Sequence, residues 1–390
     1  MRIDTVDLFY LAMPVVRDIG DGSQDALLVR VAAGPYVGWG ESEASPLTSI
    51  ASWVCPMSHS ACKPVRDSVL GQRVDDPADI ARINALVRAN SLDLLQADHT
   101  LSGVDMALWD LLGRRLSEPV YRLLGDQRAY PKLPYASVLF GDTPAETLAK
   151  AREIRAADYR ACKFGWGPYG LGTPEEDADQ VAAAREGLGD DGVLLVDAGT
   201  VWLDDVASAR ERLPALQAAH ATWLEEPFVS GATAAYAELA ALAGPVRLAG
   251  GEGSHNPYLA MQMIDHGGIG YVQIDAGRVG GITSARQVAE YAHVRGCRYV
   301  NHTFTSQLAL SASLQPYAGY DAWELCEYPV EASPMARSIT RGALERDADG
   351  LIHLPDAPGL GLEVDTEAIG EYRVEVEIRV NGRTLFGTTA

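Results

Sequence analysis

The sequence predicts an α/β protein in which parallel strands alternate with helices and close into a (β/α) barrel. The first observation is a series of short apolar, β-branched runs between residues 193 and 302. The second is that alanine-rich segments with apolar residues at helical spacing lie between these runs. Strands separated by helices are joined by crossovers, and they therefore lie parallel in one sheet.

A third observation places a candidate site on this barrel. Five successive runs each finish on a titratable side chain, about 23 to 28 residues after the previous one, roughly one strand, one helix and two loops. These side chains are Asp197, Glu225, Glu252, Asp275 and His302. One acidic residue at a strand end is more often a helix N-cap or a solvated loop charge. Five in succession favour a functional site at the carboxyl-terminal face of the barrel.

The composition is typical of a soluble globular protein with room for two domains. The chain has 390 residues, of which 47% are hydrophobic and 22% are charged. Its net charge of −21 argues against binding to nucleic acid or to anionic membrane surfaces. The same charge disfavours long-range attraction of an anionic substrate, so such a substrate needs a locally positive site.

We expect a cytoplasmic protein. No apolar run approaches the length of a membrane span, and the chain starts on a strand-like pattern without a signal peptide. The five cysteines are scattered and form no closely spaced metal-binding pair. Buried free thiols in a reducing compartment fit this pattern best.

Residues 1–128 are expected to form an α+β capping domain. Residues 3–42 read as a meander of two or three strands, and helical periodicity follows over residues 76–90 and 98–113. The first of these helices opens on an Asp-Pro start signal. The second is strongly apolar, which indicates burial between the two domains.

The barrel is expected to span residues 129–328. Its first, second and eighth strands are predicted at residues 133–138, 159–165 and 321–329. Thr173 then opens a helix with a capping side chain, a first-turn proline and early acidic residues.

In the carboxyl-terminal segment, residues 329–390, predicted strands and helices no longer alternate as they do in the barrel. We expect it to return to the capping domain, because residues 371–380 alternate like a strand that pairs elsewhere, on the amino-terminal sheet.

Three carboxylates on adjacent strands predict a magnesium site. Asp197, Glu225 and Glu252 offer only oxygen ligands, which favours Mg²⁺ over Zn²⁺. Glu226 follows Glu225 directly, so on a strand it points the other way and is the poorer ligand candidate.

The last two runs predict an acid–base pair. If their strands are neighbours, Asp275 can hold His302 in one tautomer and raise its basicity. Lys163 lies across the barrel and could supply a second proton-transfer group or a positive charge for a carboxylate. A metal with bases on both faces suits proton abstraction next to a carboxylate, where the metal stabilises an enediolate.

The motifs VDAG, WLEEP, GGE, QIDAGRVGGIT and NH, taken together, resemble the enolase superfamily, in particular its mandelate racemase-like members. The resemblance covers nearly the whole chain, including the helix SGVDMALWDLLG of the capping region. It implies an α+β cap on a modified TIM barrel of the (β/α)7β type. It also implies Mg²⁺ bound by Asp197, Glu225 and Glu252, and a His302–Asp275 dyad. Glu327 is expected to hydrogen-bond the substrate carboxylate or enediolate, with Glu324 as its rival.

The second strand departs from the family pattern. Similar proteins often carry two lysines separated by one residue, the second acting as a base, whereas this chain has Lys163-Phe164-Gly165. Lys163 matches either the first or the second lysine, and the sequence leaves both registers open. Gly199 also stands where many members have an asparagine. Both departures argue against a racemase, which needs competent bases on both faces of its substrate.

We therefore expect an acid-sugar dehydratase that converts a sugar acid to a 2-keto-3-deoxy acid. Two alternatives remain open: another enediolate reaction such as epimerisation or cycloisomerisation, and a catalytically silent barrel that serves as a binding or structural protein. We expect a small-molecule carboxylate as the substrate and a homo-oligomer as the assembly. Specificity is expected to lie in the loops at residues 15–24, 45–60 and 165–172, with Trp53, Trp166 and Tyr169 as walls.

Overall fold

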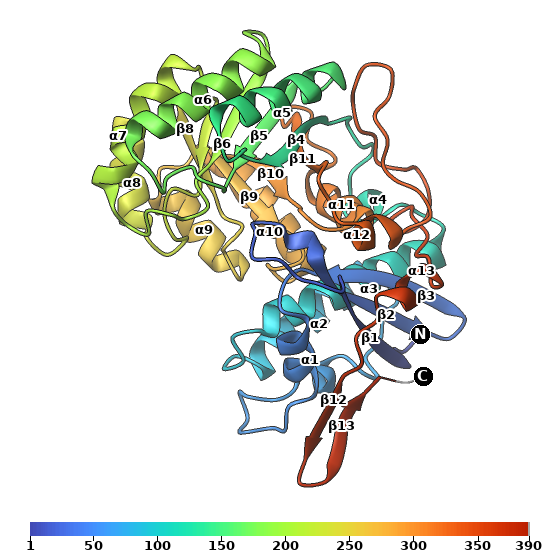
Figure 1. The fold of residues 1–390 in the computed structure, drawn as a ribbon. Coiled ribbons are helices and arrows are strands. Elements are labelled where there is room, and N and C mark those ends of the chain that lie inside the picture. Colours follow the sequence, from blue (N-terminus) through green and yellow to red (C-terminus); the bar gives the residue numbers. More distant parts are fainter. Residues whose placement is uncertain (389–390) are drawn as a thin grey trace.

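The computed structural model describes residues 1–388 and contains two main bodies, a barrel and a smaller cap that covers one end of it (Figure 1). No helix in the described part of the chain is long and apolar enough to cross a membrane.

The barrel is an eight-stranded parallel sheet with strand order β10-β9-β8-β7-β6-β5-β4-β11. Seven helices connect consecutive strands, and with the eighth strand this is the (β/α)7β arrangement that was expected. The elements run in the order β4 (Leu133–Leu139), α5 (Pro144–Ala156), β5 (Ala161–Gly165), α6 (Pro174–Leu188), β6 (Val193–Asp197), α7 (Val206–Ala218), β7 (Trp223–Glu225), α8 (Thr233–Leu242), β8 (Arg247–Gly250), α9 (Pro257–His266), β9 (Tyr271–Asp275), α10 (Gly281–Arg295), β10 (Arg298–His302), α11 (Gln307–Leu314) and β11 (Leu325–Pro329).

Local sequence explains these boundaries. α6 begins after Thr173, whose hydroxyl accepts from the amide of Glu176 while the Glu176 carboxylate accepts from the amide of Thr173. This reciprocal pair is a capping box, and its first member is the capping residue that the sequence predicted. Pro174 occupies the first turn, where its missing N–H costs nothing.

The barrel closes between β10 and β11 through side chains. In the described chain no backbone ladder joins these two strands. Instead the amide of Asn301 spans the seam: its Oδ1 accepts from the Glu327 backbone N–H at 3.0 Å, and its Nδ2 donates to the Glu327 carbonyl at 3.4 Å. The hydroxyl of Tyr317 donates to the same Oδ1 at 2.8 Å and fixes the orientation of the amide.

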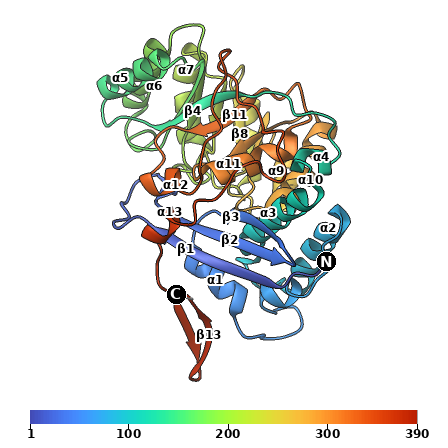
Figure 2. The same cartoon turned by 90° about the vertical axis from the view of Figure 1, so that its right-hand side faces the viewer.

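The cap combines an antiparallel sheet with helices (Figure 2). α3 lies across the sheet and is buried over most of its length. The elements are β1 (Thr5–Ala12), β2 (Asp25–Ala33), β3 (Tyr36–Ser42), α1 (Pro46–Val54), α2 (Pro77–Asn90), α3 (Ala97–Leu116) and the short α4 (Val120–Leu123). Gly38 and Gly40 permit the close packing, because a Cβ at either would lie within 2.2 Å of an α3 carbonyl oxygen.

The prediction of a loop over residues 45–60 is wrong at its start. Residues 46–54 form α1, with Pro46 in its first turn and a buried face that includes Ile50 and Trp53. The sequence was interpreted as one loop over this region, but packing of this face against the cap core stabilises a helix.

The carboxyl-terminal segment reaches the cap, as expected. It contains α12 (Pro334–Ser338), α13 (Ala368–Glu371) and the hairpin β12 (Glu377–Val380) and β13 (Arg383–Gly387). The amide of Val374 donates to the Tyr10 carbonyl at 2.8 Å, so this stretch lies along β1. The expected strand is only partly right, since residues 377–380 leave the cap sheet and pair with β13 in a hairpin that projects from the molecule (Figure 1).

Candidate active site

Strand alternation explains why the candidate residues gather inside the barrel. A buried layer fills the interior near the amino-terminal ends of the strands, and it consists of Tyr135, Ala161, Leu195, Trp223, Ala249, Tyr271 and Val300. Two residues further along each strand, the side chain again points inward. Lys163, Asp197, Glu225 and His302 each occupy such a position, so the site rests on the filled interior.

The ladder registers fix the depth of the second-strand residues. Gly165 pairs with Asp197, whereas Lys163 pairs with Leu195. Lys163 therefore lies one inward-facing position deeper than Gly165. A Cβ on Gly165 would lie 2.9 Å from Cβ and Oδ2 of Asp197, so no side chain fits there without moving Asp197. The position paired with Asp197 therefore carries no side chain, and Lys163 lines the cavity from one position deeper.

Lys163 is enclosed by carboxylates. Its Nζ lies 2.6 Å from Glu225, 2.8 Å from Glu327 and 3.6 Å from Asp197. Burial alone would lower the pKa of Lys163, but Glu225 and Glu327 outweigh burial and hold it well above its usual range. The side chain is therefore an ammonium ion, and this arrangement supports the reading in which it supplies charge.

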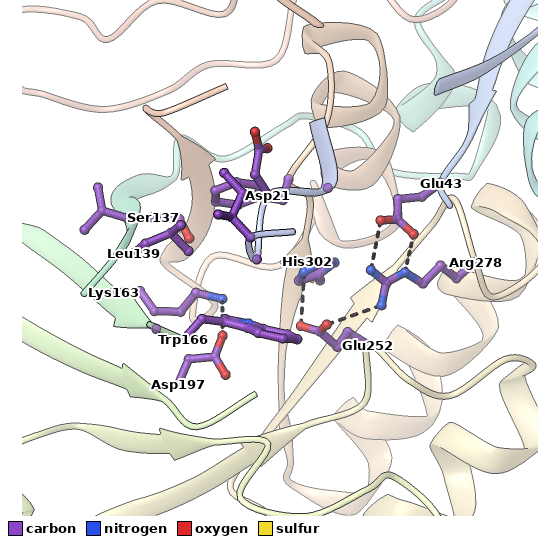
Figure 3. Close-up of a pocket in the computed structure, with 16 residues that line it drawn as sticks. Asp21, Glu43, Ser137, Leu139, Lys163, Trp166, Asp197, Glu252, Arg278 and His302 are labelled. Carbon is purple, nitrogen blue, oxygen red and sulfur yellow. Dashed lines mark hydrogen bonds and ion pairs between the residues drawn. The ribbon is translucent and has the colours of Figure 1, made fainter. Parts of the chain in front are cut away.

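His302 and Asp275 form the expected dyad. They stand opposite each other on β10 and β9, and Nδ1 of His302 lies 2.7 Å from Asp275. The other ring nitrogen, Nε2, faces the cavity and lies 3.0 Å from Glu252 (Figure 3). Burial lowers the pKa of His302, but Glu252, Glu327 and the bond to Asp275 raise it to about 10.

Glu327 lies beside this dyad, and Glu324 does not. Glu327 is fully buried, accepts from the Thr303 amide at 2.7 Å and stands 4.0 Å from Nε2 of His302. Glu324 is exposed and precedes β11. The choice of Glu327 over Glu324 agrees with this placement.

The three carboxylates expected to bind a metal lie on or just after β6, β7 and β8. Within residues 1–388, no group of three acidic, histidine or cysteine side chains is gathered closely enough to hold a metal ion. Both carboxylate oxygens of Glu225 accept hydrogen bonds: one from the ammonium of Lys163, and the other from the indole N–H of Trp223 at 2.9 Å. Glu226 follows β7 and is buried, and its carboxylate accepts from the Gly251 amide at 3.3 Å.

The donor set nevertheless has the chemistry of a hard-cation site. Asp197, Glu225 and Glu252 offer oxygen only, which suits Mg²⁺. Burial raises the pKa of Asp197 to about 6, with Lys163 opposing the rise and the charge of Glu252 adding to it. A cation beside these carboxylates would relieve their mutual repulsion.

These residues line a cavity of about 270 Å³ between the barrel and the cap. The cap contributes Glu43 and the loop residues Ile19, Gly20, Asp21 and Gly22. Arg278, from the turn after β9, and Ser137, from β4, complete a polar part of the wall. Glu43 and Arg278 were not predicted as site residues, although Glu43 is a charged residue directly after β3 and Arg278 lies inside the QIDAGRVGG motif.

Of the three predicted aromatic walls, only Trp166 lines the cavity. Its indole packs between two glycines, since a Cβ on Gly20 or Gly199 would lie 2.9 or 2.8 Å from the ring. Trp166 adopts a left-handed backbone conformation with φ of 55°, which is unusual for a bulky residue. Gly199 thus makes room for Trp166, which gives a physical reason for the glycine noted in the sequence.

The other two assignments are wrong. Trp53 belongs to α1 and is 4% exposed within the cap core. Tyr169 is 2% exposed, with its ring stacked on Phe140 at a centroid distance of 5.0 Å. Both rings are buried by packing and neither contacts the cavity, so an aromatic residue near a loop was not a sufficient signal.

The capped (β/α)7β barrel, its acidic strand ends and the histidine–aspartate dyad define a class of enzymes with the active site at the mouth of a barrel. Comparison with known proteins agrees with this class. Residues 10–125 match the mandelate racemase/muconate lactonizing enzyme amino-terminal domain, and residues 146–368 match the enolase carboxyl-terminal domain-like family. The chain belongs to the enolase superfamily, in its mandelate racemase/muconate lactonizing enzyme branch.

Several relatives are informative. A solved structure from Rhodobacter sphaeroides, described as a predicted mandelate racemase, is 59% identical, covers 100% of both chains and superposes with a TM-score of 0.96. The D-galactarolactone cycloisomerase of Agrobacterium fabrum is 30% identical over 70% of this chain and 74% of its own length. The D-galactonate dehydratase of Variovorax paradoxus is 29% identical over 69% of this chain and 72% of its own.

Proposed function

We propose that this enzyme is a Mg²⁺-dependent acid-sugar dehydratase. The proton α to the substrate carboxylate is removed, and the β-hydroxyl group then leaves as water after receiving a proton. The resulting enol tautomerises to a 2-keto-3-deoxy acid, so the reaction needs no oxidant, reductant or second substrate.

The observation that carries this proposal is the one-sided distribution of acid–base groups. His302 lines the cavity from β10, while on β5 the position paired with Asp197 is Gly165, and Lys163 lines the same cavity with its ammonium group enclosed by carboxylates. One histidine can remove the α-proton and then deliver a proton to the leaving hydroxyl group. A racemase needs a competent base on each face, and the geometry does not favour that reaction.

Lys163 and Glu327 are assigned supporting roles. The buried ammonium of Lys163 is the cation nearest the carboxylate cluster, and its charge compensates a substrate carboxylate in a protein whose net charge is −21. Glu327 adjoins both Lys163 and His302, and we assign it a hydrogen bond to the carboxylate or enediolate.

We assign Asp197, Glu225 and Glu252 as the residues that would hold Mg²⁺. When bound, the ion would stabilise the negative charge that develops on the substrate carboxylate. His302 must be neutral to accept the α-proton, and Glu252 is among the charges that keep it protonated. Pairing of Glu252 with a cation would weaken that effect.

Cycloisomerisation is the second candidate, because one relative of 30% identity is a D-galactarolactone cycloisomerase. It can begin with the same proton removal and expel a ring oxygen in place of a hydroxyl group. One acid–base histidine suffices for either reaction, so the two candidates differ in the substrate that the cavity accepts.

The test is a screen of mono- and diacid sugars and their lactones with Mg²⁺, followed by detection of 2-keto acids and by NMR in D₂O. Formation of a 2-keto-3-deoxy acid from an open-chain acid supports dehydration. Reaction with lactones alone supports cycloisomerisation. Inversion at the α-carbon without elimination would contradict both, and no reaction with any acid would favour a silent barrel.

A further inference from the structure

Glu43 connects the cap to the barrel site through Arg278 (Figure 3). Its Oε1 accepts from Nη2 of Arg278 at 2.9 Å, and its Oε2 accepts from Nε of the same guanidinium. The third nitrogen, Nη1, donates to Glu252 at 3.3 Å. Glu252 is thus the next residue in a chain of charges that continues to His302 at 3.0 Å.

Arg278 makes two hydrogen bonds to Glu43 and only one to Glu252. A guanidinium and a carboxylate pair most strongly through two parallel bonds. Glu43 takes that paired edge of Arg278 and leaves one longer bond for Glu252. Without Glu43, the same edge of Arg278 would be available to Glu252.

The position of Glu43 is fixed by the backbone around it. Its amide donates to the Gly277 carbonyl at 3.2 Å, and a Cβ on Gly277 would lie 2.8 Å from Cβ of Glu43. The next two residues, Ala44 and Ser45, are held in the left-handed region with φ of 57° and 50°. Strain of this kind persists where the surroundings hold it in place, and here it turns the chain so that Glu43 reaches the barrel.

We propose that Glu43 is a positioning residue that holds Arg278 away from Glu252 and so keeps this carboxylate available for a divalent cation. The inference rests on the metal site of the proposed function. Its physical basis is competition: a cation and a doubly bonded guanidinium would share the same carboxylate oxygens. The cap therefore sets the cation affinity of a site whose ligands all belong to the barrel.

The experiment is a titration of the full-length protein with Mg²⁺ by calorimetry at constant ionic strength. Replacement of groups that orient a metal ligand typically lowers metal affinity about 10- to 100-fold, and we expect at least about tenfold for Glu43→Gln. The matched control is Asp21→Asn, which removes another cap carboxylate from the same cavity. Its effect should stay below about threefold, because the Asp21 carboxylate accepts from the amide and hydroxyl of Ser23 and so does not restrain Arg278.

Arg278→Gln completes a double-mutant cycle. If Glu43 acts by restraining Arg278, the Glu43→Gln change should cost less than about threefold in the Arg278→Gln background. An effect that stays tenfold in that background would show that Glu43 acts through its own charge, and would overturn the proposal. Equal losses for Glu43→Gln and Asp21→Asn would overturn it as well.

Arg278→Gln alone provides a test that does not depend on the folding of the Glu43 variant. It should bind Mg²⁺ at least as tightly as the unaltered protein, whereas a tenfold loss would show that Arg278 supports Glu252. Absence of Mg²⁺ binding by the unaltered protein would remove the metal assignment itself. Normal Mg²⁺ binding by both the unaltered protein and Glu43→Gln would refute only the role of Glu43.

Discussion

The two sides of the cavity differ in how their ionisable groups are held. On the β9–β10 side, His302 has one nitrogen fixed by Asp275 and the other facing the cavity. On the β5 side, Lys163 has its only nitrogen surrounded by three carboxylates, and the position above it is glycine. The first side leaves a titratable nitrogen facing the cavity, whereas the second holds its nitrogen in ion pairs.

This contrast shows that the presence of a basic residue does not establish a base. A lysine can remove a proton only when its amine is neutral, and the carboxylates around Lys163 raise its pKa. Histidine titrates near neutral pH, so small changes in nearby charge decide whether it gives or takes a proton. We therefore expect substitutions on the β9–β10 side to lower activity and substitutions on the β5 side to lower stability.

The largest expected effect is loss of chemistry in His302→Asn. A general acid–base group contributes about 10²- to 10⁴-fold, so kcat should fall by that amount and α-proton exchange in D₂O should be lost. His353→Asn is a matched control, because His353 also lies 2.7 Å from an aspartate, Asp347, but at the surface. Full turnover by His302→Asn would contradict the assignment of proton transfer to the β9–β10 side of the cavity.

Lys163→Met should cost stability while proton exchange persists. Removal of one partner from a buried ion pair typically costs about 3 to 5 kcal/mol of unfolding free energy. Lys150→Met is the control, because Lys150 pairs with Glu331 at 2.9 Å in a partly exposed position and should contribute about 1 kcal/mol or less. Denaturant unfolding with a chelator present gives these values. Loss of α-proton exchange without loss of stability would identify Lys163 as a base.

Gly165→Ala tests whether the level above Lys163 can hold a side chain. The added Cβ would meet Asp197 at 2.9 Å, and overpacking of this kind costs about 1 to 3 kcal/mol. Gly231→Ala is the control, because no atom lies within 4 Å of a Cβ there. Equal unfolding free energies for both variants would show that Asp197 yields easily, so that a second base could be accommodated.

The smallest expected effect concerns the wall on the β5 side. Trp166→Ala removes an indole from the cavity, and aromatic contacts are worth about 0.5 to 1.5 kcal/mol, or roughly 2- to 13-fold in KM with kcat little changed. Leu171→Ala, in the same loop and 74% exposed, should leave KM unchanged. A fall in kcat at constant KM would mean that Trp166 shapes the reacting geometry and not only the binding.

The sequence predicted the parts of the fold that depend on local periodicity. Short apolar, β-branched runs at regular spacing were sufficient to place Asp197 and His302 at strand ends, because each run lies within one βα unit. α1 was missed because its helix depends on contacts with distant parts of the cap, and Trp53 was misplaced with it.

A site residue could be predicted from the sequence only where its position at the end of one strand was enough to assign its role. The register of Lys163 required its depth relative to Asp197, which is a property of the ladder between β5 and β6. The contact between Glu43 and Arg278 joins residues 235 positions apart. No local pattern encodes that distance, so the cap's contribution to the site emerged only from the structure.

The seam between β10 and β11 has a consequence for local unfolding. Elsewhere neighbouring barrel strands are joined by backbone ladders, but here the side chains of Asn301 and Glu327 supply the bonds. Fewer bonds must break for these two strands to separate, so transient opening should begin at the seam and expose the Glu327 amide to hydrogen exchange first. His302 and Glu327 lie on the two separating strands. β10 keeps its five-pair ladder to β9, so opening of the seam would separate His302 from Glu327 while leaving the contact between His302 and Asp275 in place.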